Sequence, residues 1–306
     1  MLRDVLLTAS RNRVVRRIVE NAPVSRNVVR RFVAGRSVDD AVQVTAALIA
    51  NGLTVSLDHL GEDTTEVGHA EATTKAYVTL LSRLAEQDLA ARAEVTVKLS
   101  AVGQALDEAL ALDNARAICE AAAAAGTTVT LDMEDHTTTD STLGVLRELR
   151  GDFPWVGAVL QAYLRRTESD CRDLAYAGSR VRLCKGAYKE PESVAFQSRL
   201  DVDKSYVRCL RVLTQAPGYP MVATHDPRLV AIASALVERA GRAKGSYEFQ
   251  LLYGVRPKEQ LRLAGAGETV RIYVPYGDEW YGYLMRRLAE RPANIGFFLR
   301  AVATKS

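Results

Sequence analysis

The chain has 306 residues, of which 48% are hydrophobic and 25% charged, a composition typical of a globular protein with a sizeable core. Its 40 basic and 37 acidic residues nearly cancel, which gives no argument for a nucleic-acid partner. The four cysteines form no Cys-x-x-Cys pair and have no histidine at metal-ligand spacing, so we expect a fold that depends on neither disulfides nor zinc.

Residues 1–50 have a helical pattern, in which apolar residues recur between arginines. We therefore expect a helical extension over residues 1–50, followed by a single catalytic domain over residues 51–306. The arginines interrupt the first apolar stretch too early for a secretory signal. No charge-free stretch is long enough to cross a bilayer, so a cytoplasmic location is expected.

Eight short apolar runs follow the extension. They lie at residues 53–57, 95–99, 128–133, 157–161, 180–184, 221–225, 247–250 and 270–274. Helix-compatible stretches separate successive runs, which predicts parallel strands joined by helical crossovers. An open doubly wound sheet is the alternative, but eight units in series favour closure into a (βα)8 barrel of the TIM type.

Polar residues close nearly every one of these runs. Because catalytic groups of such barrels project from the carboxyl ends of the strands, this repeated placement indicates an active site there. Any one of these residues alone is typical of a salt bridge at the rim. The set is Asp58, Lys98, Asp132 with Glu134, Gln161, Arg182 with Lys185, Thr224 with His225, Glu248 with Gln250, and Tyr273.

These residue types are also typical of two other kinds of site, a metal site and a Schiff-base site. A metal site is not expected, because successive side chains of a strand alternate faces and at most Asp132 and Glu134 point the same way. Lys98 or Lys185 could serve as the Schiff-base lysine of an aldolase-type barrel, and the pattern alone leaves that alternative open.

The helix predicted near residue 283 carries Tyr283, Arg286, Arg287 and Glu290 within two turns. Residues three or four apart share a helix face, so an aromatic ring and an arginine pair can line one side. Guanidinium groups match a carboxylate bidentately, which suits a clamp on a small acid. A solvated basic face is the alternative, but the turn at Pro275 and Gly277 directs the helix over the barrel mouth.

Several of these segments together resemble the motifs of the proline dehydrogenase family. They are LDHLGED, VKLS, LDMEDH, LQAYLRR, RLCKGAYKEP, ATHD, YEFQLLYGVR and RIYVPYGDEWYGYLMRRLAE, in the family's order over residues 57–290. The pair RLxKGAYxE and YLxRRLxE is specific to that family. The length resembles the small monofunctional bacterial members, and the sequence is also similar to the proline dehydrogenase domain of the bifunctional proline utilisation enzymes.

The resemblance implies a distorted (βα)8 barrel with FAD across the carboxyl ends of the strands. It implies oxidation of L-proline to 1-pyrroline-5-carboxylate by hydride transfer to flavin N5, with electrons passed to a quinone or another acceptor. A separate 1-pyrroline-5-carboxylate dehydrogenase would then receive the product. The arginine-rich extension would suit peripheral contact with the inner face of the membrane, where quinones reside, although a solvated basic face is the simpler interpretation.

The resemblance also implies roles for individual residues. Lys98, Arg286 and Arg287 would bind the proline carboxylate, and Leu252, Tyr273 and Tyr283 would wall the ring. Asp132 and Arg182 would be catalytic, with Asp132 beside the substrate and Arg182 close to flavin N5. Glu62 would pair with Arg287 as a gate. The expected FAD contacts are Met133, Gln161, Arg182, Lys185, Gly186, Ala187, Thr224, His225 and Glu248.

Overall fold

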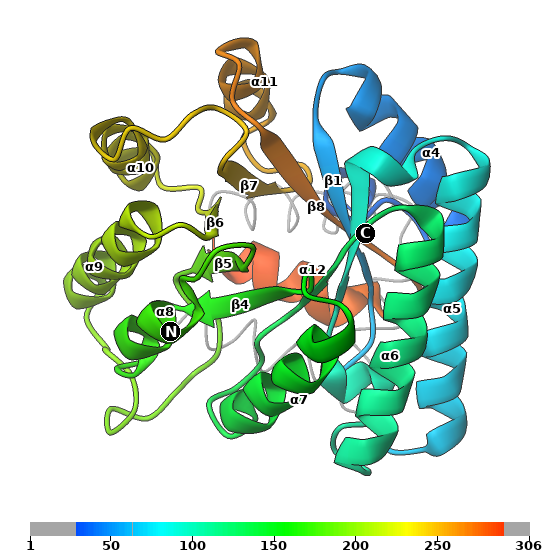
Figure 1. Cartoon of the computed structure of the whole chain (residues 1–306). Coiled ribbons are helices and arrows are strands. Elements are labelled where there is room, and N and C mark those ends of the chain that lie inside the picture. Colours follow the sequence, from blue (N-terminus) through cyan, green and yellow to red (C-terminus); the bar gives the residue numbers. More distant parts are fainter. Residues whose placement is uncertain (1–28, 63, 291–306) are drawn as a thin grey trace, which may run out of the picture.

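The computed structural model describes residues 29–62 and 64–290, without the side chains of residues 286–290. Its strands form a closed barrel in which each strand pairs in parallel with the next and β8 pairs with β1 (Figure 1). The predicted (βα)8 fold is therefore confirmed. The strands are β1 Thr54–His59, β2 Ala93–Val97, β3 Val129–Leu131, β4 Gly157–Gln161, β5 Arg180–Cys184, β6 Tyr219–Ala223, β7 Glu248–Leu252 and β8 Val270–Tyr276.

Helices connect successive strands and surround the barrel. They are α5 Val67–Glu86, α6 Glu108–Ala125, α7 Thr139–Asp152, α8 Thr167–Leu174, α9 Arg199–Gln215, α10 Pro227–Arg239 and α11 Pro257–Gly265. Short 3₁₀ turns at Ala90–Arg92 and Leu99–Val102 flank β2. Several helices begin where the sequence supplies a capping side chain: Asp107, Ser198 and Asp226 each accept a backbone N–H of the first turn.

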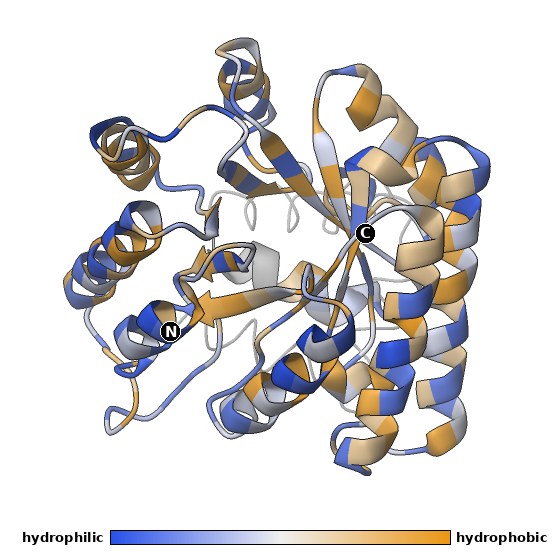
Figure 2. Ribbon diagram, in the orientation of Figure 1, coloured by the Kyte–Doolittle hydropathy of each residue, from blue (hydrophilic) through white to orange (hydrophobic). Residues whose placement is uncertain are grey.

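The apolar core lies between the outer face of the strands and the inner faces of the helices. Val55, Leu57, Val95 and Val97 alternate along β1 and β2 and are fully buried there. Figure 2 shows the corresponding division on the long helices α5 and α6, with hydrophobic residues concentrated on one side and hydrophilic residues on the other. Burial of each such side chain contributes about 1.5–3 kcal/mol to the free energy of unfolding. The packing of the helices on the outer face of the strands therefore stabilises the barrel.

The helix that precedes the barrel packs onto it. Helix α4, Val38–Ala50, begins at the capping box formed by Ser37 and Asp40 and packs on the barrel core through Ala41. Most of the predicted extension, residues 1–28, lies outside the described residues. A division of the chain at residue 50 stays a prediction.

Helix α12, Trp280–Glu290, lies across the centre of the ring of strands (Figure 1). Its Trp280, Tyr281 and Leu284 form a buried cluster with Leu60, which follows β1, and with Phe32. Because Leu60 lies beyond the carboxyl end of its strand, α12 covers that end of the barrel. The sequence prediction that this helix lies over the mouth is borne out by this contact.

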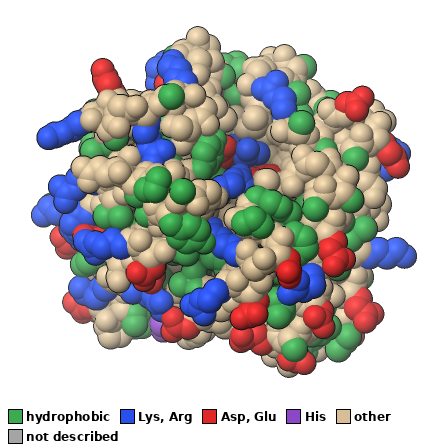
Figure 3. All heavy atoms as spheres, viewed as in Figure 1, with side chains coloured by type: hydrophobic (Ala, Val, Ile, Leu, Met, Phe, Trp, Pro, Cys, Tyr) green, Lys and Arg blue, Asp and Glu red, His purple; other side chains and the backbone are tan. Residues whose placement is uncertain are grey.

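Figure 3 shows acidic and basic side chains mixed over the visible face of the molecule, as the small net charge leads one to expect. Among the described helices, none combines the length and the apolar character that a membrane span requires.

Candidate active site

The interior of the barrel carries buried ion pairs. TIM barrels are commonly filled by branched apolar side chains, but here inward positions hold charges of both signs. Isolated buried charges are costly, and each charge in this interior has an opposite partner within 4 Å. The cations are Lys98, Arg180, Arg182 and Arg271, and the carboxylates are Asp58, Glu94, Asp132 and Glu248. The set is electrically neutral.

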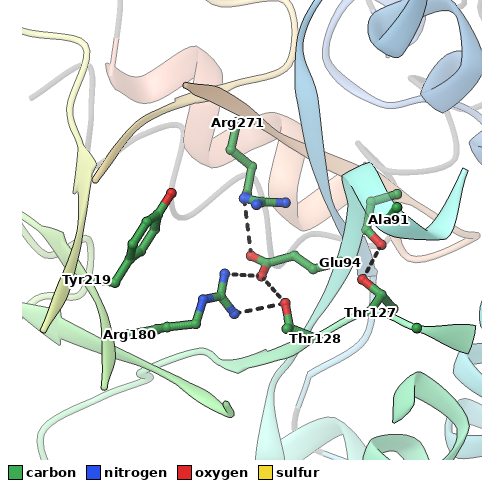
Figure 4. Close-up of a pocket in the computed structure, with 9 residues that line it drawn as sticks. Ala91, Glu94, Thr127, Thr128, Arg180, Tyr219 and Arg271 are labelled. Carbon is green, nitrogen blue, oxygen red and sulfur yellow. Dashed lines mark hydrogen bonds and ion pairs between the residues drawn. The ribbon is translucent and has the colours of Figure 1, made fainter. Parts of the chain in front are cut away.

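The layer at the amino end of the barrel surrounds Glu94. Its carboxylate lies 2.7 Å from Arg180 Nη2 and 3.7 Å from Arg271 Nε (Figure 4). Burial would raise the pKa of Glu94, but Arg271, Arg180 and Arg182 outweigh it and hold the pKa well below its usual range. A cavity of about 220 Å³ opens beside this layer, with Thr128 and Tyr219 in its wall.

Glu248 belongs to this layer at the amino end of the barrel. The prediction that it lies at the carboxyl end of a strand is wrong. It opens β7 instead of closing it, and it is fully buried. Its oxygens accept hydrogen bonds from Arg271 Nε at 2.8 Å and from the Tyr219 hydroxyl at 3.2 Å. Glu248 therefore supports Arg271 at the amino end of the barrel, and it is linked to Arg182 only through Gln250.

Arg182 occupies the centre of the barrel, where it is 4% exposed. A guanidinium has five N–H donors, and all five have acceptors in this structure. The guanidinium carbon Cζ of Arg182 also lies over the Tyr273 ring, 5.5 Å from its centre. The acceptors are Gln250 for Nε, Thr96 and Asp132 for Nη1, and Ser56 and Glu94 for Nη2.

The mouth of the barrel begins one layer above Arg182. There Asp132 accepts from Arg182 Nη1 at 2.8 Å through one oxygen and from the Tyr273 hydroxyl at 2.8 Å through the other. Burial, followed by the charges of Asp132 and Asp58, raises the pKa of Tyr273, so its hydroxyl stays a donor. The structure thus brings three predicted site residues, one directly after β3 and the others on β5 and β8, into one hydrogen-bonded group.

Lys98 joins the same mouth as the first residue after β2. Its Nζ lies 2.7 and 2.8 Å from the two carboxylate oxygens of Asp58. Burial would lower the pKa of Lys98, but Asp58, Asp132 and Glu62 outweigh it and raise that pKa, so the ammonium form is held. The sequence places Asp58 at a strand end but indicates no role for it.

The predicted cofactor residues of β3 and β4 meet beside this group. Gln161 Nε2 donates to the Met133 carbonyl at 3.1 Å, whereas Gln161 Oε1 is buried with no hydrogen-bond partner among the described residues. Thr224 is buried after β6. His225 follows it, and its Nε2 accepts the backbone N–H of Leu252 at 2.9 Å, which places the proton of a neutral ring on Nδ1.

The loop after β5 holds Lys185, Gly186 and Ala187. Gly186 has φ of +108°, and a Cβ there would overlap the ring of Tyr163, so only glycine fits. Lys185 is paired with Asp203 and, at 3.3 Å, with Asp226, so it lies at the rim facing α9 and α10. Ala187 is exposed.

The sequence did not indicate one group of side chains that connects three loops at the barrel mouth. This group, Glu190 with His136 and Tyr163, is called the latch here. Glu190, 7% exposed, accepts from the His136 backbone N–H at 3.0 Å, from the Tyr163 hydroxyl at 3.2 Å and from His136 Nδ1. These residues come from the loops after β3, β4 and β5. Glu190 stands within the recognised segment RLCKGAYKEP, but only its tertiary partners show what it does.

Asp132 and Glu134 do not converge. Asp132 points into the barrel, whereas Glu134 accepts from the Ser100 backbone N–H at 3.1 Å and from its hydroxyl at 2.6 Å. Burial raises the pKa of Glu134. Within residues 29–62 and 64–290, no group of three or more His, Cys, Asp or Glu side chains is arranged to hold a metal ion.

The remaining predicted residues lie on or near α12. Tyr283 is buried in the cluster formed by α12 and the residues around Leu60. The side chains of Arg286 and Arg287 lie outside the described residues, so the carboxylate clamp and the gate between Glu62 and Arg287 stay predictions.

A closed (βα)8 barrel whose carboxyl end gathers a fixed lysine, an arginine, an aspartate and a tyrosine has the architecture of a barrel enzyme. The family model of proline dehydrogenase matches residues 41–300. The chain therefore belongs to the proline dehydrogenase family, and it is an enzyme that oxidises proline.

Individual relatives agree with this assignment. The chain is 37% identical to proline dehydrogenase 1 of Bacillus subtilis over 305 residues, covering 100% of both proteins. It is 40% identical to a proline dehydrogenase of Deinococcus radiodurans, covering 90% of each. Among solved structures, it matches proline utilization A of Bdellovibrio bacteriovorus inactivated by N-propargylglycine with a TM-score of 0.81 at 25% identity, covering 92% of this chain and 34% of that one. The chain thus spans about a third of that larger protein.

Proposed function

We propose that this enzyme oxidises L-proline to 1-pyrroline-5-carboxylate by hydride transfer to N5 of a bound FAD, and that a quinone-type acceptor takes up the electrons. The observation that carries the proposal is the fixed group at the barrel mouth, in which Asp132 joins Arg182 to Tyr273 and Asp58 holds Lys98. Family membership supplies the substrate class, and these side chains fit it.

The mouth suits a small cyclic amino acid. Lys98 offers a buried positive charge to the substrate carboxylate, and Arg286 and Arg287 are its proposed partners. The Tyr273 ring, with the proposed walls Leu252 and Tyr283, excludes water from the pyrrolidine ring and strengthens those charge contacts. Fixing the carboxylate and the ring together orients the reacting carbon.

The residues predicted to hold FAD fit a flavin on two observations. Gln161 Oε1 is a buried acceptor that lacks a donor among the described residues, as expected of a group that awaits a ligand. Gly186 presents bare backbone at a positive φ beside Tyr163. Met133, Thr224, His225, Lys185 and Ala187 complete the proposed contacts, and the flavin would supply the electron sink.

Arg182 acts on a flavin through its charge. Its five donors are already engaged by the protein, so the guanidinium is fixed before any ligand arrives. A fixed positive charge beside a ring that becomes negative stabilises the reduced form without reorganisation. Proline must also lose an amine proton, and Arg286 and Arg287, the proposed partners of its carboxylate, would add the positive charge that favours the neutral amine over the ammonium.

The aldolase alternative loses support from the lysines themselves. A Schiff-base lysine reacts as the neutral amine, which is usually obtained by desolvation away from carboxylates. Lys98 is bonded to Asp58 and its pKa is raised, and Lys185 is paired with Asp203 and Asp226. The contact with Asp58 holds the Lys98 ammonium form, and both carboxylates of the other pair engage the Lys185 nitrogen directly.

An anaerobic absorbance spectrum before and after addition of L-proline tests the proposal. We expect flavin bands that bleach on addition of proline and return with a quinone acceptor. N-propargylglycine, which inactivates the proline utilization A of Bdellovibrio bacteriovorus, should bleach the same bands irreversibly. Purified protein that neither binds added FAD nor oxidises proline would overturn the proposal.

The remaining proposals concern the surroundings of the enzyme. The product would pass to a separate 1-pyrroline-5-carboxylate dehydrogenase, and residues 1–50 would form an extension that touches anionic membrane from the cytoplasmic side. Deletion of residues 1–35 should abolish sedimentation with anionic vesicles. Failure of the intact chain to sediment would end the membrane proposal and leave the catalytic one unaffected.

A further inference from the structure

The buried pair of Asp58 and Lys98 is a contact to which neither the family motifs nor the predicted roles assign a function. Asp58 stands next to last in β1 and is 0% exposed, and Lys98 follows the neighbouring strand β2 and is 8% exposed. The two strands pair directly, with Asp58 opposite Thr96. Both carboxylate oxygens lie within 2.8 Å of the ammonium nitrogen.

The geometry of the pair shows what Asp58 can do for Lys98 at the barrel mouth. An ammonium has three N–H donors on a flexible four-carbon stem, and a single carboxylate engages at most two of them. Asp58 therefore fixes the stem and leaves at least one donor for a ligand. The arrangement differs from that of Arg182, whose donors are all taken by the protein.

We propose that Asp58 is a positioning residue for proline oxidation: it holds the Lys98 ammonium, in charged form, at the place where the substrate carboxylate binds. The inference rests on the proposed function, in which Lys98 receives that carboxylate. Asp58 itself does not contact the substrate in this scheme.

Other ionisable groups also act on Lys98. They are His59 on β1, Glu62 after β1, and Asp132 and Glu134 after β3. Asp58 is the carboxylate in direct contact, and it is the first of the carboxylates that oppose the loss of the Lys98 proton. Removing its charge should therefore affect Lys98 more than removal of any of the others.

The test is the pH dependence of KM for L-proline in Asp58→Asn, which keeps the shape and removes the charge. We expect KM at neutral pH to rise about tenfold or more, because a charge-assisted hydrogen bond is lost. KM should rise further toward alkaline pH as Lys98 loses its proton, whereas wild-type KM should show no such rise. Asp170→Asn, which removes a buried carboxylate of α8 that pairs with Arg166 at the start of that helix, outside the barrel, is the matched control and should keep the wild-type profile.

A double-mutant cycle separates positioning from a general structural effect. Lys98→Met should raise KM, and Asp58→Asn should add nothing further in that background. An equal effect of Asp58→Asn in both backgrounds overturns the proposal. Normal proline KM in Lys98→Met removes the proposed role of Lys98 and overturns the inference with it, although proline oxidation by the wild type would still stand.

Asp58→Glu keeps the inference testable should Asp58→Asn fail to fold. It retains the charge but displaces the carboxylate by one methylene. We expect a raised KM with the wild-type pH profile. An unchanged KM would show that the position of this carboxylate is immaterial.

Discussion

Replacing Arg182 by methionine removes the cation at the centre of the barrel while keeping a long apolar stem. Two carboxylates then lose an ion-pair partner: Asp132, which keeps the Tyr273 hydroxyl, and Glu94, which keeps Arg180 and Arg271. The neutral acceptors Ser56, Thr96 and Gln250 each lose a donor. The change therefore breaks a buried ionic network without exposing it to water.

The loss of stability in Arg182→Met depends on the partners that Asp132 and Glu94 keep. Removing one partner of a buried ion pair costs about 3–5 kcal/mol, and the partners that stay behind place this change at the lower end, about 3 kcal/mol. At roughly 2–4 °C per kcal/mol, the apparent melting temperature should fall by about 6–12 °C.

The deficit should also depend on pH. In the wild type the pKa of Glu94 is depressed, so its contribution is present above its unfolded pKa and is lost only as pH falls through the still lower folded value. Without Arg182 the folded pKa of Glu94 rises, and acid then protonates a carboxylate that lacks part of its counter-charge. The difference between variant and wild type should be largest near neutral pH and shrink as pH falls through the raised folded pKa of Glu94 in the variant.

Thermal unfolding followed by circular dichroism on flavin-free protein measures both effects. Arg262→Met is the matched control, because that arginine is 60% exposed and, among the described residues, pairs only with Glu259 on the same helix, so it should cost no more than about 1 kcal/mol. Arg182→Lys, with three donors and the same charge, should fall between the two. Equal melting of Arg182→Met and Arg262→Met at neutral pH would refute the reasoning.

Three further substitutions probe the mouth. Glu190→Gln replaces one of the two carboxylate oxygens that accept from His136 and Tyr163 by an NH2 donor and removes the charge, and it should weaken FAD binding about tenfold in a fluorescence titration of flavin-free protein; unaltered affinity would separate the latch from the cofactor. Gly186→Ala should displace the ring of Tyr163 and cost about 1–3 kcal/mol, measured by thermal unfolding and by flavin occupancy after purification. Tyr273→Ala should raise kcat/KM for trans-4-hydroxy-L-proline relative to L-proline, because the ring obstructs a substituent on the substrate; efficient hydroxyproline turnover by the wild type would contradict this.

The strands could be predicted because their outward-facing residues are apolar and because stretches with helical periodicity separate one strand from the next. Their depth in the barrel could not. The run predicted at residues 247–250 extends to Leu252 in the structure, so Glu248 opens the strand. A shift of two residues leaves a side chain facing the same way but moves it about 7 Å along the strand. Glu248 thereby passes from the predicted mouth to the amino-end layer beside Arg271.

The pairing of charges was beyond the sequence for a different reason. Lys98 is recognisable as a cation at the mouth, but Asp58 lies 40 positions away, and Glu190 reaches His136 across 54. Strand register and loop packing decide which carboxylate pairs with which cation. Local sequence patterns contain no information on either. These partners also explain why the interior is polar at all. Cations held by protein carboxylates keep their positions whether or not a ligand is bound, so the field at the mouth exists before the substrate arrives and needs no reorganisation when charge moves.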